Sequence, residues 1–234
     1  MALNMVSTGS SILDDALRGG YENEVVTTIY GPAGAGKTNL CLLCLVNAAK
    51  QGKKVIFIDT EGGFSLARLE QIDPEFKKIL DNMFLFKPTT FDEQKKVFEQ
   101  LREMINDDKL NEKIGLIIVD SVSMLYRLEM GKNGDNSNIS IANKELGYQV
   151  SVLTEIARKK NIPVLLTNQV YSSFDERDKV NMVGGDILKY GSKCLIELQK
   201  FHGNRRKFVL RKHRSLPEDT NVVFSIVDKG IEGC

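Results

Sequence analysis

The hydrophobic and polar positions of the chain alternate between short apolar runs and longer amphipathic segments. Residues 55–58 (VIFI) and 116–119 (LIIV) are apolar throughout, and residues 25–30 (VVTTIY) are rich in β-branched side chains. Runs of this kind are typical of strands buried on both faces of a parallel sheet. The apolar periodicity of the segments between them predicts helices at 37–49, 91–105 and 141–160.

The alternation of strands and helices indicates an α/β fold with a mainly parallel, doubly wound sheet. In the last part of the chain the helical pattern gives way to short strands around a turn at 202–204, which predicts a C-terminal antiparallel hairpin at one edge of this sheet. At 234 residues, we expect a single domain spanning residues 1–234. The later strands are expected at 163–167, 194–199, 207–211 and 222–227.

One stretch carries a recognisable chemistry. Directly after the first strand, residues 31–38 read GPAGAGKT and satisfy the phosphate-binding pattern G-x-x-x-x-G-K-[ST]. Glycines let successive backbone N–H groups converge on phosphate oxygens, the lysine adds a point charge, and the threonine hydroxyl is a ligand for Mg²⁺. The sequence therefore predicts a P-loop that binds ATP and Mg²⁺. The predicted nucleotide-binding residues are Gly31, Pro32, Ala33, Gly34, Ala35, Gly36, Lys37, Thr38 and Asn39.

Polar side chains also follow three other predicted strands, and ligands in such sheets bind at the carboxyl ends of the strands. Asp120 ends one strand, and we expect it to hold Mg²⁺ with Thr38. Glu61 is the best candidate for the general base that orients the attacking water. Gln169 precedes a polar segment at 170–185, so its amide is placed to sense the terminal phosphate and relay its presence to that segment.

Composition excludes several classes of protein. The chain is 42% hydrophobic and 27% charged, which is ordinary for a globular domain. No apolar run approaches the 18 residues or so of a membrane span, and the N-terminus lacks a signal-peptide pattern. Cys41 and Cys44 are expected to be core residues of a helix rather than metal ligands. We therefore expect a cytoplasmic, nucleoid-associated protein with no membrane partner.

The net charge of +1 is unevenly distributed. Residues 189–214 hold nine Lys or Arg against one acid, Glu197. Such a patch indicates an anionic partner, although charge alone fits a solvated hairpin face equally well. If the partner is DNA, sequence-independent binding through the phosphate backbone is expected. The candidate DNA-binding residues in this segment are Lys189, Lys193, Arg205, Arg206 and Lys207.

The motifs together resemble a known family. GPAGAGKT, DTEGGF (59–64), LIIVDS (116–121) and TNQV (167–170) occur in the order and spacing of the RecA/RadA recombinase cores. The N-terminal STGSSILDDALRGG is similar to the entry segment of the archaeal members. A core without the helical N-terminal domain is most similar to the archaeal RadB paralogues. The resemblance implies a RecA-like P-loop NTPase core.

The resemblance also implies roles for further residues. Arg127 matches the arginine that opens the first DNA-binding loop, here 127–140, of which 131–140 is expected to be a mobile loop. Residues 170–183 match the second DNA-binding loop. Arg68 occupies the place of an arginine beside the adenine, although its surroundings match only partly.

Two departures from the family pattern bear on assembly. Residues 1–6 contain no Phe-x-x-Ala polymerisation motif. Where the family carries Asp-Ser-Pro, this chain has Lys212, His213 and Arg214. Lys212 and Arg214 resemble cationic fingers that reach the γ-phosphate of a neighbouring subunit, and they equally fit a basic hairpin face.

These observations favour an ATP- and DNA-binding accessory protein of DNA repair and homologous recombination, with a weak ATPase and no strand exchange of its own. Expected partners are single-stranded or branched DNA and, by resemblance, recombinase or Holliday-junction-processing proteins. A homodimer or a nucleotide-dependent oligomer also fits. The alternatives are a DNA-stimulated recombinase or motor ATPase, and a nucleotide-gated protein scaffold.

Overall fold

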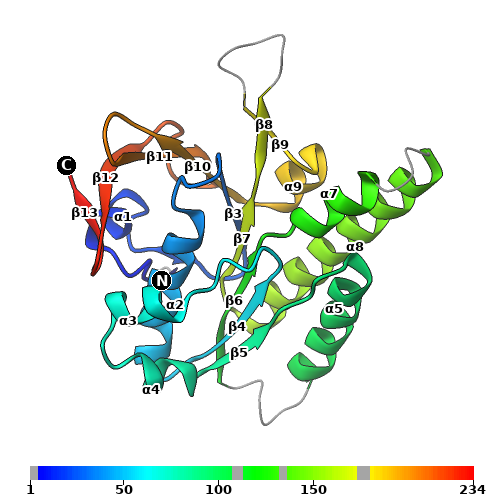
Figure 1. The fold of residues 1–234 in the computed structure, drawn as a ribbon, viewed down its shortest axis with the longest axis horizontal. Coiled ribbons are helices and arrows are strands. Elements are labelled where there is room, and N and C mark those ends of the chain that lie inside the picture. Colours follow the sequence, from blue (N-terminus) through cyan, green and yellow to red (C-terminus); the bar gives the residue numbers. More distant parts are fainter. Residues whose placement is uncertain (1–4, 107–112, 132–135, 173–179) are drawn as a thin grey trace.

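The computed structural model describes residues 5–106, 113–131, 136–172 and 180–234. Its centre is a nine-stranded sheet with the strand order β13-β12-β11-β10-β3-β7-β6-β4-β5 (Figure 1). Two short antiparallel pairs, β1 with β2 and β8 with β9, lie outside this sheet. The strands are β1 (Met5–Val6), β2 (Tyr21–Glu22), β3 (Val26–Tyr30), β4 (Lys54–Asp59), β5 (Met83–Phe86), β6 (Ile114–Asp120), β7 (Val164–Asn168), β8 (Val170–Ser172), β9 (Val180–Met182), β10 (Cys194–Lys200), β11 (Arg205–Lys212), β12 (Asn221–Val227) and β13 (Gly230–Gly233).

The sheet confirms the predicted fold class. Strands β3 to β7 run parallel to one another, and β10 is parallel to β3, while β11, β12 and β13 add antiparallel strands at one edge. The tail differs from the prediction in one respect, because β10 pairs in parallel with β3 and so belongs to both parts of the sheet. The β10–β11 hairpin thus starts directly beside the strand that leads into the P-loop.

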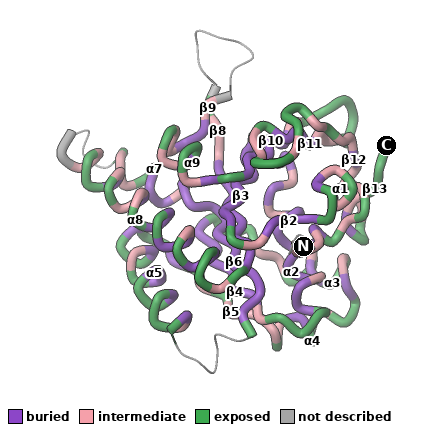
Figure 2. The backbone as a smooth tube through the Cα atoms, turned by 180° about the vertical axis from the view of Figure 1, so that it is seen from behind, coloured by how far each residue is buried: buried purple, intermediate pink, exposed green. Residues whose placement is uncertain are grey.

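Helices cover both faces of the sheet, as a doubly wound fold requires. Alternate residues of a strand point to opposite faces, so Phe57 packs in a core with α1 to α4, whereas Ile56 and Ile58 pack in a second core with α5 and α7 to α9. Figure 2 shows the buried positions following the central strands. The helices are α1 (Ser11–Ala16), α2 (Lys37–Lys50), α3 (Leu66–Ile72), α4 (Phe76–Leu80), α5 (Phe91–Asn106), α7 (Met124–Gly131), α8 (Asn136–Lys160) and α9 (Gly185–Gly191).

Two loop predictions are wrong over the described residues. The stretch 131–140 was expected to be a mobile loop, but Gly131 ends α7 and residues 136–140 form the start of α8. Residues 170–172 and 180–182 were expected to be a loop, but they form the antiparallel pair β8–β9. In both places the polar composition predicted a loop. Pairing or packing with a neighbouring segment nevertheless gives a regular element there. Residues 132–135 and 173–179 of the two predicted DNA-binding loops lie outside the described residues.

Short elements with weak patterns escaped prediction altogether. They are β1 and β2, which pair with each other, α7, α9 and the edge strand β13. In the described part of the chain, no helix combines the length and apolar character needed to span a membrane.

Candidate nucleotide-binding site

The P-loop connects the end of β3 to the start of α2, and its glycines are required by close packing. A Cβ added to Gly31 would lie 2.2 Å from the carbonyl oxygen of Leu198 on β10. Gly36 has φ +101°, and a Cβ there would lie 3.0 Å from Cδ1 of Ile226. Larger residues would therefore push the loop away from β10 and β12. The loop is consequently held between α2 and the C-terminal strands.

Lys37 folds back over its own loop. Its Nζ donates to the carbonyl oxygens of Gly31 (2.9 Å) and Pro32 (3.1 Å), and the residue is only 7% exposed. Burial lowers the pKa of Lys37 below its ordinary value, while the charges of Glu61 and Asp120 act in the opposite direction. An anion bound beside a largely buried ammonium that has only carbonyl partners would be strongly stabilised by its charge.

Asp120 sits at the carboxyl end of β6, as predicted, and is almost completely buried. Its Oδ2 accepts a hydrogen bond of 2.6 Å from the hydroxyl of Thr38, and its Oδ1 accepts one from the hydroxyl of Thr167. Burial raises the pKa of Asp120, and the two hydroxyl donors partly offset this effect. Thr167 was missed from the sequence, although its place at the end of the neighbouring strand β7 was a usable signal.

The oxygens around Asp120 fit a magnesium ion that is shared with phosphate. Mg²⁺ prefers one or two protein oxygens together with water and nucleotide phosphates, rather than an all-protein cage. Carboxylate and hydroxyl oxygens stand together here, and a Cβ on Gly63 would lie 3.4 Å from Thr38 Oγ1. Bound there, the ion would neutralise charge on the β- and γ-phosphates.

A chain of side-chain hydrogen bonds extends from the P-loop region to α7 through Glu61, Gln169 and Arg127. Gln169 Nε2 donates to Glu61 Oε1 at 3.0 Å, and Arg127 Nη1 donates to Gln169 Oε1 at 3.4 Å. Glu61 follows β4, Gln169 follows β7, and Arg127 lies on α7. The structure thus brings together the predicted base, the predicted relay and an arginine predicted from resemblance to contact DNA.

A cavity of about 380 Å³ adjoins the P-loop and is the candidate nucleotide cavity. Arg68 lines it, but the guanidinium is held by Asn39 Oδ1 at 2.8 Å and by the carbonyl oxygens of Val227 (2.8 Å) and Gly230 (3.3 Å). Arg68 therefore ties α2 and α3 to the β12–β13 turn at the edge of the cavity. The lining residues are Ala33, Gly34, Gly36, Lys37, Thr38, Asn39, Leu42, Glu61, Gly63, Arg68, Gln169 and Ile226.

The two predicted cationic fingers have partners within the chain. Lys212 Nζ donates to the carbonyl oxygens of Lys189 (2.6 Å) and Ser192 (2.8 Å) at the end of α9, where a cation is favourable. Arg214 Nε lies 2.8 Å from Oε2 of Glu22, whose side chain is 4% exposed. The two side chains thus have different partners, and both sets of partners lie within this chain. Both contacts stabilise the fold of this chain.

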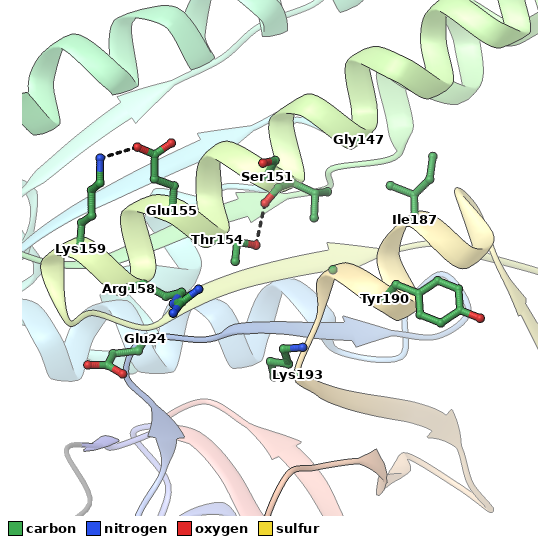
Figure 3. A pocket seen from close by; sticks show the side chains of 12 residues that line it. Glu24, Gly147, Ser151, Thr154, Glu155, Arg158, Lys159, Ile187, Tyr190 and Lys193 are labelled. Carbon is green, nitrogen blue, oxygen red and sulfur yellow. Dashed lines mark hydrogen bonds and ion pairs between the residues drawn. The ribbon is translucent and has the colours of Figure 1, made fainter.

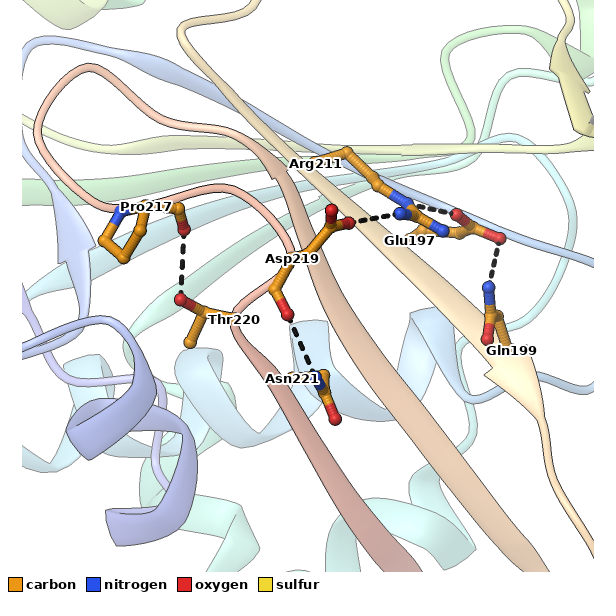
Figure 4. A network of polar contacts seen from close by, with 7 residues as sticks. All are labelled: Glu197, Gln199, Arg211, Pro217, Asp219, Thr220 and Asn221. Carbon is orange, nitrogen blue, oxygen red and sulfur yellow. Dashed lines mark hydrogen bonds and ion pairs between the residues drawn. The ribbon is translucent and has the colours of Figure 1, made fainter.

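Other cations of the basic segment are neutralised locally. Arg211 bridges Glu197, at 2.7 Å, and Asp219 (Figure 4). Lys189 lies on α9, Lys193 lies just before β10, and Arg205 and Lys207 lie on β11. Arg206 contacts the P-loop instead of facing outward with the others. The structure therefore brings only part of the predicted DNA-binding set to an open surface.

Below about pH 6.5 we expect the free energy of unfolding to fall as the solution is acidified, because of His213. Its side chain is 2% exposed, and its Nδ1 accepts the backbone N–H groups of Ser215 and Leu216. Burial lowers the pKa of His213, Glu22 opposes this shift, and Arg214 adds to it. The unfolded chain then binds more protons than the folded chain below the ordinary histidine pKa, so stability is lost as the pH falls.

Urea unfolding at pH 7.5 and pH 5.5 tests this expectation. His213→Gln should reduce the difference in unfolding free energy between the two pH values. His202→Gln is the matched control, because the chain has two histidines and His202 is exposed at the β10–β11 turn. An unchanged pH dependence in His213→Gln would contradict the assignment.

A second cavity, of about 780 Å³, lies between α8 and α9, away from the P-loop (Figure 3). Several of its polar groups already have partners: Lys159 Nζ lies 2.6 Å from Glu155, and the hydroxyl of Thr154 donates to the carbonyl oxygen of Val150 at 2.8 Å. The smaller cavity at the P-loop, by contrast, collects the buried lysine, the predicted base and the predicted relay. The P-loop cavity is therefore the better candidate for a binding site.

The sheet and the P-loop geometry define a RecA-like P-loop core. A family model described as Rad51 matches residues 1–234, and the chain belongs to this family. More narrowly, it is a relative of the archaeal RadB proteins. It is 44% identical over 230 residues to the DNA repair and recombination protein RadB of Methanobrevibacter smithii, covering 97% of this chain and 94% of the relative.

Further comparisons agree with this assignment. The RadB of Methanocaldococcus jannaschii is 40% identical over 225 residues, covering 94% of this chain and 99% of that protein. A solved structure described as the crystal structure of the RadB recombinase superimposes with a TM-score of 0.80 at 36% identity, covering 98% of this chain and all of the other. The resemblance seen in the sequence motifs is thereby confirmed.

Proposed function

We propose that this protein is an ATP- and DNA-binding accessory factor of DNA repair and recombination, with a weak ATPase. Its RadB relatives are named DNA repair and recombination proteins, and the Rad51 and RecA-like family generally binds ATP with Mg²⁺. Residues 31–39 and Arg68 would hold the nucleotide, and Thr38 and Asp120 would hold Mg²⁺. The fit of these groups around the 380 Å³ cavity supports the first part of the proposal.

The observation that carries the proposal is the chain of contacts from Glu61 through Gln169 to Arg127. Glu61 is the candidate acceptor for the proton of an attacking water, and Gln169 occupies one of its carboxylate oxygens. A displacement of Gln169 would therefore free this oxygen of Glu61 and change its ability to accept a proton. Since Arg127 contacts the other end of the same amide, an anion bound at α7 would be sensed at the nucleotide cavity.

DNA would bind through its backbone phosphates, without sequence preference and with strong salt dependence. Arg127, Lys189, Lys193, Arg205 and Lys207 are the proposed contacts, because among the described residues no acidic side chain pairs with them. Recombinases or Holliday-junction-processing proteins are the proposed protein partners, alongside a homodimer or nucleotide-dependent oligomer. The internal contacts of Lys212 and Arg214 favour an accessory role over a motor driven by fingers acting between subunits.

Steady-state ATP hydrolysis with and without single-stranded DNA tests this proposal. We expect turnover well below the roughly 1 s⁻¹ at the lower end of typical enzymes, with little stimulation by DNA. Glu61→Gln should abolish the residual rate while leaving nucleotide binding intact, which separates hydrolysis by this site from a contaminant. Strong stimulation by DNA would instead establish the recombinase or motor alternative. If the protein did not bind DNA at low salt, the nucleotide-gated scaffold would be the remaining alternative.

A further inference from the structure

Arg206 was predicted to bind DNA, but its side chain reaches the P-loop. Its Nε donates to the carbonyl oxygen of Gly34 at 3.1 Å, and its Nη1 donates to the carbonyl oxygen of Arg205 at 3.0 Å. Gly34 lies in the middle of the loop, with φ +72°. The residue separation of 172 shows that this is a tertiary contact between β11 and the phosphate-binding segment.

A second cation stands at the same face of the loop. Lys200 pairs with Arg206 across the β10–β11 ladder, so the two side chains share one face of the hairpin. A Cβ on Gly34 would point towards Lys200, 3.5 Å from its Nζ. The described residues contain no carboxylate within ion-pair distance of Lys200 or Arg206. The side of the loop that carries the Gly34 carbonyl is thus faced by two unneutralised cations.

The hydrogen bonds of the other carbonyl groups of the P-loop indicate what the Arg206 contact does. Lys37 bonds the carbonyl oxygens of Gly31 and Pro32, and the backbone N–H of Leu40 bonds that of Gly36. Arg206 holds the loop between these two anchored ends. A loop that turns its N–H groups towards phosphate turns its carbonyl groups outward, so a donor behind it keeps the N–H groups aimed.

We propose that Arg206 is a positioning residue of the nucleotide site, which fixes the P-loop from its outer side and links it to the β10–β11 hairpin. This inference rests on the proposed binding of ATP. It also divides the basic segment in two: Arg205 faces the hairpin tip, with its guanidinium 5.4 Å from the Phe201 ring and its Nε bonded to the His202 carbonyl oxygen, whereas Arg206 faces the P-loop. Adjacent strand residues point to opposite faces, which gives the two arginines separate tasks.

The affinity for a non-hydrolysable ATP analogue with Mg²⁺, measured without DNA, tests the inference. Arg206→Ala should weaken binding by about fivefold, as expected for losing one charge-assisted hydrogen bond at a partly exposed site. Arg206→Lys should restore most of the affinity, because it keeps a cationic donor. Arg102→Ala is the matched control, because Arg102 is an exposed arginine on α5 that donates to the hydroxyl of Tyr148, and it should bind the analogue like the wild type.

Hydrogen exchange of the nucleotide-free protein supplies a second readout. In Arg206→Ala, the amide of Ala35, which donates to the Pro32 carbonyl oxygen within the loop, should exchange faster, while those of β11 and β12 stay unchanged. A general loosening of the hairpin would instead speed exchange in both strands, and this result would overturn the inference. Equal analogue affinity of wild type and Arg206→Ala would also overturn it. A wild-type protein that binds no analogue would overturn the proposed function itself.

Discussion

Lys37→Ala is expected to weaken the binding of an ATP analogue at least about 100-fold, equivalent to roughly 2.7 kcal/mol. Lys37 is 7% exposed as a residue, and its ammonium has the carbonyl oxygens of Gly31 and Pro32 as hydrogen-bond partners. Phosphate oxygens would replace these neutral acceptors with charged ones, and hydrogen bonds between charged partners are roughly twice as strong as neutral ones. Titration calorimetry with a non-hydrolysable analogue measures this loss.

Lys53→Ala is the matched control, because Lys53 is exposed just beyond the opposite end of α2. It should bind the analogue like the wild type. The thermal midpoint of nucleotide-free Lys37→Ala should stay close to that of the wild type, because the variant also removes the cost of burying a cation. Full affinity in Lys37→Ala would mean that the P-loop is not the phosphate site.

Phe57→Ala is expected to lower the free energy of unfolding by about 3–5 kcal/mol, the typical cost of removing a fully buried phenylalanine. Phe57 lies in the middle of β4 and has no exposed surface. Its ring contacts Phe64 edge-on, with 5.5 Å between the centroids, and Phe64 lies three residues after Glu61 in the loop that follows β4. The cavity left by the substitution would therefore loosen that loop. Urea unfolding followed by circular dichroism measures the change.

Phe201→Ala makes the same chemical change at an exposed position. Phe201 is 40% exposed at the hairpin tip, where it touches His202 and Arg205. Its loss should cost less than about 1 kcal/mol. Similar destabilisation by the two substitutions would contradict the placement of Phe57 in the core.

The parts of the fold that could be predicted are those where one strong pattern dominates. The apolar runs of β4 and β6 are typical of strands that are buried on both faces of a sheet. Their place in the interior of the sheet could therefore be predicted from these runs. The start of α8 could not be predicted in this way. Its first residues are Asn and Ser, yet the helix continues through them and packs beside α7. Propensity is a weak prior once a neighbouring helix supplies packing.

The candidate site shows the same division. Glu61, Asp120 and Gln169 stand at or just beyond strand ends, and the topology of a parallel sheet gathers such ends at one edge. Lys37 and Thr38 begin the helix that follows the P-loop, which itself starts at the end of β3. Contacts made from the C-terminal strands carry no local signal. The bonds of Arg206 to Gly34 and of Arg68 to the β12–β13 turn join residues that lie 172 and about 160 positions apart. Only the three-dimensional structure reveals them.

The place of β3 in the sheet has a consequence for folding during synthesis. This strand carries the P-loop and lies near the N-terminus, but both of its neighbours, β7 and β10, come from the second half of the chain. A nascent chain therefore holds a P-loop strand without partners until most of the protein has left the ribosome. Pairing between residues so distant in sequence is slow to form. The candidate nucleotide site is thus expected to be completed among the last features of the molecule, and an incomplete chain would lack the strands that flank the P-loop strand.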